Sequence, residues 1–171
     1  MNRELIGKVN KLLTRIVYGL LIIAGFYGSF TLELYSRAKP AAGKMLTAAE
    51  RTGYKETTLY NDVMSFVFEA QAQSEHIKVM RMATSTEGRM IPLVTVSKEG
   101  VKTPGELAAS GKPAVLIMAN IHAGEIEGKE AVLMLLRDFA NGKHMDWLDR
   151  QVVLLVPIFN ADGNDRLGHN R

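Results

Sequence analysis

Two apolar runs with an amphipathic segment between them constrain the fold of this chain more than any other feature. The first run spans residues 114–121 and the second spans residues 152–159. Between them, four apolar residues recur at helical spacing: Val132, Leu135, Leu136 and Phe139. This helix is expected to end near Asn141-Gly142. Strand, helix and strand in this order predict a right-handed βαβ unit with two buried, parallel strands.

The segment before these runs predicts a helix and a hairpin. Four apolar residues at helical spacing predict an amphipathic helix over 61–73: Val63, Phe66, Val67 and Ala70. Residues 77–83 and 91–97 alternate apolar and polar side chains around a polar turn at 84–89, which predicts a β-hairpin. Residues 98–112 contain Pro and Gly and are expected to form a loop. The expected fold class is α/β, with a mainly parallel but mixed sheet and helices on both faces.

Composition limits the possible sites and partners. The 171 residues allow one domain and a separate N-terminal segment, and an apolar content of 47% is typical of a globular protein. The absence of Cys excludes disulfides and leaves His, Asp, Glu and backbone oxygen as metal ligands. The formal net charge of +3 lies entirely within residues 1–38, and the remaining residues are neutral as a group. This distribution does not support a nucleic-acid-binding face.

Residues 1–38 have the layout of an export signal. Four basic residues precede an uncharged, apolar run over 16–32: Arg3, Lys8, Lys11 and Arg15. Ser36 and Ala38 are small residues suited to cleavage before Lys39, and an uncleaved membrane anchor is the alternative. Under both alternatives the remaining chain is exported to the outer side of the cytoplasmic membrane, as a periplasmic, secreted or membrane-anchored protein. Residues 39–55 are expected to be a linker with one short helix, and residues 56–171 the domain.

Polar side chains follow both apolar runs. His122 and Glu125 come directly after the first run, and Asn160-Ala161-Asp162-Gly163 follows the second. In α/β sheets ligands bind at the carboxyl ends of parallel strands, so these clusters are expected to meet. An imidazole and a carboxylate at this spacing can bind one Zn²⁺ together. The same spacing also fits a histidine at a strand end and a glutamate at a helix N-terminus, and Asn160 fits a turn.

This order of motifs resembles the carboxypeptidase A-like zinc metallopeptidases, in which His-x-x-Glu is followed by a helix, a strand and an Asn-Pro-Asp-Gly type turn. The resemblance runs from about Thr52 to the last residue, and residues 87–89 and 124–130 are similar to a bacterial, secreted branch. It implies roughly the first half of the metallocarboxypeptidase sheet, a Zn²⁺ cofactor and a peptide substrate. It implies zinc-dependent peptide hydrolysis for the complete enzyme.

The resemblance also assigns roles to individual residues. It implies that His122 and Glu125 are two of the three zinc ligands, and that Asp162 orients His122 through the other ring nitrogen. It implies that Arg171 stabilises the oxyanion, with Arg166 as the alternative. The family's third ligand, a histidine, and its catalytic glutamate follow later than residue 171. This chain alone is therefore expected to be inactive or very weakly active.

The remaining candidates are not expected to take part in the site. His76, His144 and His169 are not expected to replace the missing ligand, because a lone histidine is more often structural or solvated. Glu127 and Glu130 are expected to be surface carboxylates on the helix.

Two other functions stay open: an aspartoacylase-type zinc amidohydrolase and a non-catalytic, membrane-tethered binding module. The export signal and the 160–163 turn favour the peptidase.

Overall fold

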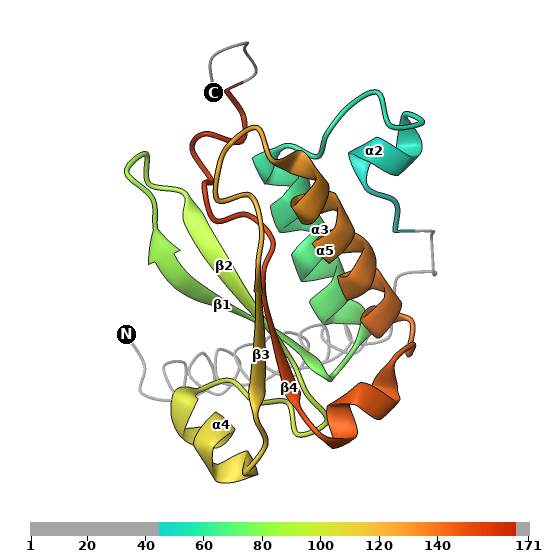
Figure 1. Ribbon diagram of the computed structural model, residues 1–171, viewed down its shortest axis with the longest axis vertical. Coiled ribbons are helices and arrows are strands. Elements are labelled where there is room, and N and C mark those ends of the chain that lie inside the picture. Colours follow the sequence, from blue (N-terminus) through green and yellow to red (C-terminus); the bar gives the residue numbers. More distant parts are fainter. Residues whose placement is uncertain (1–44, 167–171) are drawn as a thin grey trace, which may run out of the picture. The chain divides into compact units, whose positions relative to one another are not determined.

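A computed structural model describes residues 45–166 of the chain. The described elements are α2 (Ala48–Arg51), α3 (Tyr60–Gln73), β1 (Ile77–Thr84), β2 (Met90–Val96), α4 (Pro104–Ser110), β3 (Ala114–Met118), α5 (Ile126–Ala140), the 3₁₀ helix η1 (Met145–Asp149) and β4 (Val152–Val156) (Figure 1). The predicted export segment, His169 and Arg171 lie outside the described residues. Within residues 45–166, no helix combines the length and apolarity needed to cross a membrane.

The four strands form one mixed sheet in the order β1-β2-β4-β3. β1 and β2 form the predicted antiparallel hairpin, and β2 also runs antiparallel to β4. β3 and β4 are parallel, with Ala114 opposite Val152 and Met118 opposite Val156, and α5 connects them. The α/β class, the hairpin and the βαβ unit are therefore confirmed. Two of the three pairings among the described strands are antiparallel, so this part of the sheet is not mainly parallel.

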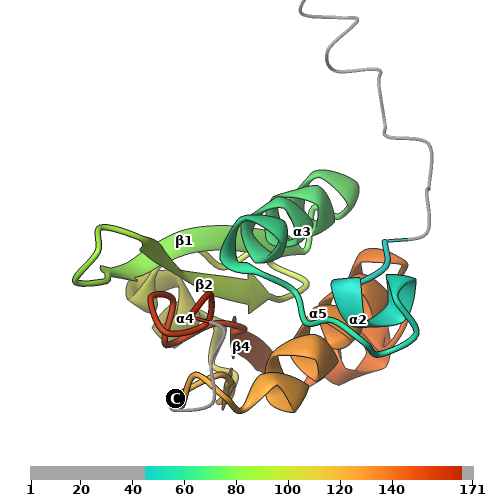
Figure 2. The ribbon, with the colours of Figure 1, turned by 90° about the horizontal axis from the view of Figure 1, so that it is seen from above.

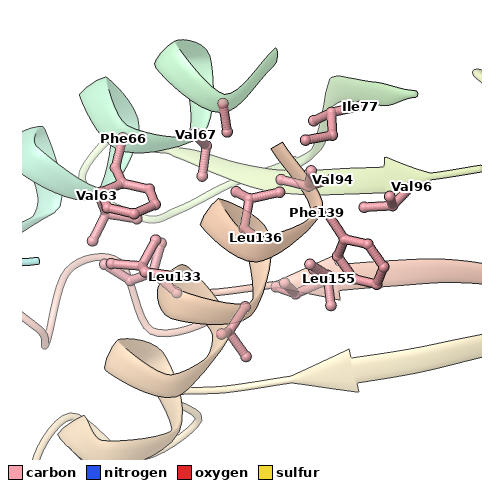
Figure 3. Packing of buried hydrophobic residues seen from close by; sticks show 14 of the residues in the cluster. Val63, Phe66, Val67, Ile77, Val94, Val96, Leu133, Leu136, Phe139 and Leu155 are labelled. Atoms are coloured by element: carbon pink, nitrogen blue, oxygen red, sulfur yellow. The ribbon is translucent and has the colours of Figure 1, made fainter. Parts of the chain in front are cut away.

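The core lies where α3 and α5 pack side by side against the sheet (Figures 1 and 2). Figure 3 shows side chains from both helices and from the strands meeting there: Val63, Phe66 and Val67 of α3; Leu133, Leu136 and Phe139 of α5; and Ile77, Val94, Val96 and Leu155 of the sheet. Burying each such aliphatic or aromatic side chain contributes about 1.5–3 kcal/mol. The helix predicted over 61–73 is confirmed as α3. On α5, Leu133 is fully buried, whereas Leu135 is only partly buried.

The predicted loop over 98–112 contains a helix, α4, so that prediction was wrong for residues 104–110. Thr103 accepts a hydrogen bond from the backbone N–H of Glu106, whose side chain in turn accepts from the backbone N–H of Thr103. Pro104 occupies the first turn, and Gly111 ends the helix in the left-handed conformation at φ 67°. The Pro and Gly that suggested a loop are the residues that begin and end this helix.

β3 lies at the edge of the described sheet, next to β4 alone. The sequence predicted a buried strand, yet every side chain of β3 except that of Ile117 is exposed, with Leu116 54% and Val115 40% accessible. An apolar run therefore identified the strand correctly but not its place in the sheet. An unpaired edge of this kind favours aggregation.

Part of the predicted linker over 39–55 is packed into the domain. Met45 and Ala49 are buried, and Thr47 caps α2. Arg137 of α5 donates hydrogen bonds to the carbonyl oxygen of Met45 at 2.9 Å and to Glu50 at 2.6 and 2.8 Å. Burial raises the pKa of Glu50, but the hydrogen bonds from Arg137 and from the backbone N–H of Thr47 together hold that pKa below the ordinary value.

Candidate metal centre

Backbone hydrogen bonds carry the pairing of β3 and β4 past the ends of both strands. The N–H of Ala119 donates to the carbonyl of Val156 at 2.9 Å, and the N–H of Phe159 donates to the carbonyl of Ala119 at 3.0 Å. The N–H of Asn160 then donates to the carbonyl of Asn120 at 2.9 Å. The polar turns that follow the two strands therefore start side by side, as the βαβ arrangement predicted.

His122 and Glu125 form a close pair after β3. Their Nδ1 and Oε1 atoms are 2.8 Å apart, and the ionised carboxylate accepts the ring proton. Glu125 directly precedes α5 and its side chain does not cap that helix, which leaves the carboxylate directed to His122. The hydrogen bond from His122 holds the pKa of Glu125 below its ordinary value. Both side chains are open to solvent, with 78% and 62% of their surfaces accessible.

The second turn has the Asx geometry predicted for it. Oδ1 of Asn160 accepts a hydrogen bond from the N–H of Gly163 at 2.9 Å. At Gly163, a Cβ atom would lie 2.8 Å from the Cβ of Ala123 and 2.8 Å from Oδ1 of Asn160. Real side chains do not approach this closely, so the glycine permits the turn to touch the loop that bears His122.

The structure brings Asp162 to the hairpin turn and not to His122. Its Oδ1 accepts from the hydroxyl of Ser85 at 2.6 Å, and its Oδ2 accepts from the N–H of Glu87 at 3.1 Å. Arg89 lies 3.6 Å from the same carboxylate. The Ser85 hydrogen bond, assisted by these neighbours, holds the pKa of Asp162 below its ordinary value. The role predicted for Asp162 in orienting His122 has no corresponding hydrogen bond within residues 45–166.

Arg166 forms an ion pair with Glu87, and 71% of its side chain is exposed. This pair joins the second turn to the tip of the β1–β2 hairpin. The structure does not bring Arg166 to the His122–Glu125 pair, and Arg171 lies outside the described residues. The oxyanion role of either arginine stays a prediction.

The sequence profile of the zinc carboxypeptidase family matches residues 64–171, which is more than half of the chain. The chain belongs to the zinc carboxypeptidase family. No curated protein sequence matches it significantly.

Three solved structures have the same fold over part of their length. Carboxypeptidase A from Helicoverpa armigera matches with a TM-score of 0.57 and 19% identity, over 90% of this chain and 39% of that one. Bovine thrombin-activatable fibrinolysis inhibitor, solved with tick carboxypeptidase inhibitor, matches with a TM-score of 0.53 and 19% identity, over 66% and 34%. Metallo-carboxypeptidase from Burkholderia cenocepacia matches with a TM-score of 0.50 and 25% identity, over 61% and 27%. The chain thus covers between about a quarter and two fifths of these structures.

The family implies zinc, and the donor atoms of His122 and Glu125 fit it in part. Two ligands that lie 2.0–2.1 Å from a tetrahedral zinc ion are roughly 3.3 Å apart. Nδ1 and Oε1, at 2.8 Å, need to separate by only about 0.5 Å to reach that spacing. Within residues 45–166, no group of three or more His, Cys, Asp and Glu side chains is placed to bind a metal. The described residues therefore offer one imidazole and one carboxylate as donor groups at this position.

The other described histidines lie away from this pair. His144 follows α5 at the end opposite to Glu125, where it stacks on Trp147 with ring centroids 4.4 Å apart. His76 precedes β1, and its Nδ1 atom is buried. That neither histidine replaces the missing ligand stays a prediction.

The sequence did not predict a buried polar cluster that α5 forms with residues 57–58 and Asn164. Lys129 of α5 is fully buried, and its Nζ donates to the carbonyl of Thr58 at 2.5 Å and to Oδ1 of Asn164 at 2.6 Å. Glu130 accepts from the N–H of Thr58 at 2.6 Å and from the hydroxyls of Thr57 and Thr58 at 2.9 and 2.8 Å. The prediction that Glu130 is a surface carboxylate was therefore wrong. Lys129 links α5, which follows the His122–Glu125 pair, to the second turn.

The sequence contained a signal for Lys129. It precedes Val132 by three residues and Leu133 by four, so it continues the apolar stripe of α5 by one turn towards Glu125. A charged residue on the buried face of a helix needs hydrogen-bonding partners, which the tertiary structure supplies here.

Proposed function

We propose that this chain carries part of the active site of a zinc-dependent peptidase of the metallocarboxypeptidase type. The observation that carries the proposal is the His122–Glu125 pair, with Nδ1 and Oε1 2.8 Å apart after a parallel strand, in a member of the zinc carboxypeptidase family. The family relationship favours peptides as the substrates.

His122 and Glu125 would hold the metal through one nitrogen and one oxygen. When bound, the zinc ion supplies a Lewis acid that polarises the scissile carbonyl and lowers the pKa of its water. The carboxylate of Glu125, whose pKa the His122 hydrogen bond holds below its ordinary value, is ionised at neutral pH and able to bind a cation. Arg171, with Arg166 as the alternative, is proposed to stabilise the oxyanion. Asp162 is proposed to orient His122. In that role the Asp162 carboxylate would have to give up the hydrogen bond that it accepts from Ser85 and accept one from His122.

Zinc titration of the 171-residue chain tests this proposal. We expect His122→Ala to weaken zinc binding by about tenfold or more, because one of two described ligands is lost. His144→Ala is the matched control, since it removes a histidine at the opposite end of α5, and it should bind zinc as the unchanged chain does. Equal binding by the chain and by His122→Ala would refute the assignment of this metal centre.

We also propose that the chain is exported across the cytoplasmic membrane. The basic residues before the apolar run over 16–32 support this location. N-terminal sequencing of the protein from fractionated cells should find either Lys39 as the first residue or an intact N-terminus in the membrane fraction. Recovery of the intact chain in the cytoplasm would contradict export.

A further inference from the structure

The loop between β3 and α5 contains a buried residue in a left-handed conformation. Asn120 has φ 54° and is only 2% accessible, although it lies two residues from the exposed His122. A left-handed backbone is unfavourable for most side chains, and asparagine tolerates it better than others. The chain turns sharply at Asn120, between the end of β3 and the His122–Glu125 pair.

The side-chain amide of Asn120 faces the backbone of the loop that it begins. Its Nδ2 lies 3.3 Å from the carbonyl oxygen of His122, 3.3 Å from that of Ala123 and 3.4 Å from that of Glu125. Three carbonyl oxygens only accept hydrogen bonds, so the NH₂ group must face them and the amide oxygen must point away. Two hydrogens shared among three acceptors make individually weak bonds that together close the loop.

The backbone of Asn120 joins this loop to the second turn. Its carbonyl accepts from the N–H of Asn160 at 2.9 Å. The same two turns touch again where Gly163 meets Ala123. Asn120 therefore connects the loop bearing both metal ligands to the neighbouring strand exit.

The orientation of the amide has an energetic cost. Oδ1 of Asn120 is buried and has no hydrogen-bond partner within residues 45–166. A buried polar atom without a partner costs about 1–3 kcal/mol. Glycine would adopt the same backbone conformation without that cost. The sharp turn at residue 120 therefore does not require the asparagine amide. The contribution left for the amide is to hold the three carbonyl oxygens in place.

We propose that Asn120 is a positioning residue that holds His122 and Glu125 together for metal binding. Its effect on zinc rests on the proposed function, whereas its effect on the loop does not. Asn120 touches neither zinc nor substrate in this role. It acts by fixing the backbone within the His-x-x-Glu segment, through the carbonyls of His122, Ala123 and Glu125.

The test compares Asn120→Gly with Asn141→Gly in the 171-residue chain. Asn120→Gly allows the left-handed backbone and removes the side chain that carries the amide. Asn141→Gly makes the same substitution at the other end of α5. Zinc affinity is measured by competition with a chelator, and amide hydrogen exchange is measured at Glu125 and Ile126 and, for comparison, in β4.

We expect Asn120→Gly to weaken zinc binding and to accelerate exchange at Glu125 and Ile126, each by about tenfold. Exchange in β4 should stay unchanged, which a general loss of stability would not produce. Asn141→Gly should change neither zinc affinity nor loop exchange. If the chain binds zinc and Asn120→Gly binds it equally well, the inference is overturned. If the unchanged chain binds no zinc, the proposed function fails, and loop exchange alone decides whether Asn120 positions the pair.

Discussion

Replacing Lys129 by Met is expected to destabilise the folded chain by about 3–5 kcal/mol, because the buried carboxylate of Glu130, 3.9 Å from the ammonium, is left without an opposite charge. Lys129 is fully buried and donates to Thr58 and Asn164, which belong to different segments. Hydrogen bonds to a charged group contribute about 1.5–3 kcal/mol each, so two such bonds give a similar magnitude. Met retains the packing of the aliphatic stem and loses only the ammonium group.

Urea unfolding, followed by the fluorescence of the single tryptophan, Trp147, measures this loss. For a domain with an unfolding slope of about 2 kcal/mol per molar urea, a loss of 4 kcal/mol lowers the midpoint by about 2 M. Because small domains are stable by only about 5–15 kcal/mol, a variant that is already unfolded without urea would also agree with the prediction.

Lys143→Met provides the matched control. Lys143 lies 2.9 Å from Asp138, but 61% of its side chain is exposed, so its loss should change stability by less than about 1 kcal/mol. A Lys129→Met variant as stable as Lys143→Met would refute the reasoning, because it would mean that the buried ammonium group adds nothing beyond a surface pair.

Two further predictions concern the second turn. Gly163→Ala should destabilise the chain by about 1–3 kcal/mol in urea unfolding, because its Cβ would lie 2.8 Å from that of Ala123. Gly105→Ala should be neutral or stabilising, since the nearest atom to its Cβ is 4.0 Å away. The Ser85 hydrogen bond is the main cause that lowers the pKa of Asp162 in the folded chain. The ionised Asp162 carboxylate therefore stabilises the fold above the unfolded pKa of about 3.9, and this stabilisation is lost as pH falls through the folded pKa. The amide resonance of Glu87, which donates to Asp162, should therefore shift in acid, below about pH 4.

The outcomes that contradict these two predictions are specific. Equal stability of Gly163→Ala and Gly105→Ala would mean that the two turns do not touch as the structure has them. An Asp162→Asn variant should lose the acid shift at Glu87, and a shift that survives this substitution would show that another group causes it.

The elements that the sequence predicted well are those with a local cause. The apolar spacing of α3, the alternation in the β1–β2 hairpin and the order of β3, α5 and β4 are all visible within short windows. The prediction failed at α4, because Pro104 and Gly111 were interpreted as loop residues and not as the two ends of a helix. The sequence signals for the correctly predicted elements and for α4 were all local, and only the signals for α4 were misinterpreted.

The approach of His122 to Glu125 was predictable for the same reason. His122 and Glu125 are three residues apart at a strand exit, so their approach depends on one turn of chain. The partners of Asp162 were not predictable from the motif, because Ser85 lies 77 residues away along the chain. The hairpin packs onto the second turn only when the sheet is assembled.

The sequence by itself determined the α/β elements, the parallel strand pair and the candidate ligands His122 and Glu125, because periodicity and short spacing are local properties of the chain. The tertiary structure alone decided that β3 is exposed at the sheet edge and that Lys129 is buried. Lys129 bonds to Thr58 across 71 residues and to Asn164 across 35 residues. A charge can be buried at such a place only where distant segments supply its hydrogen-bonding partners, and that requires the complete fold.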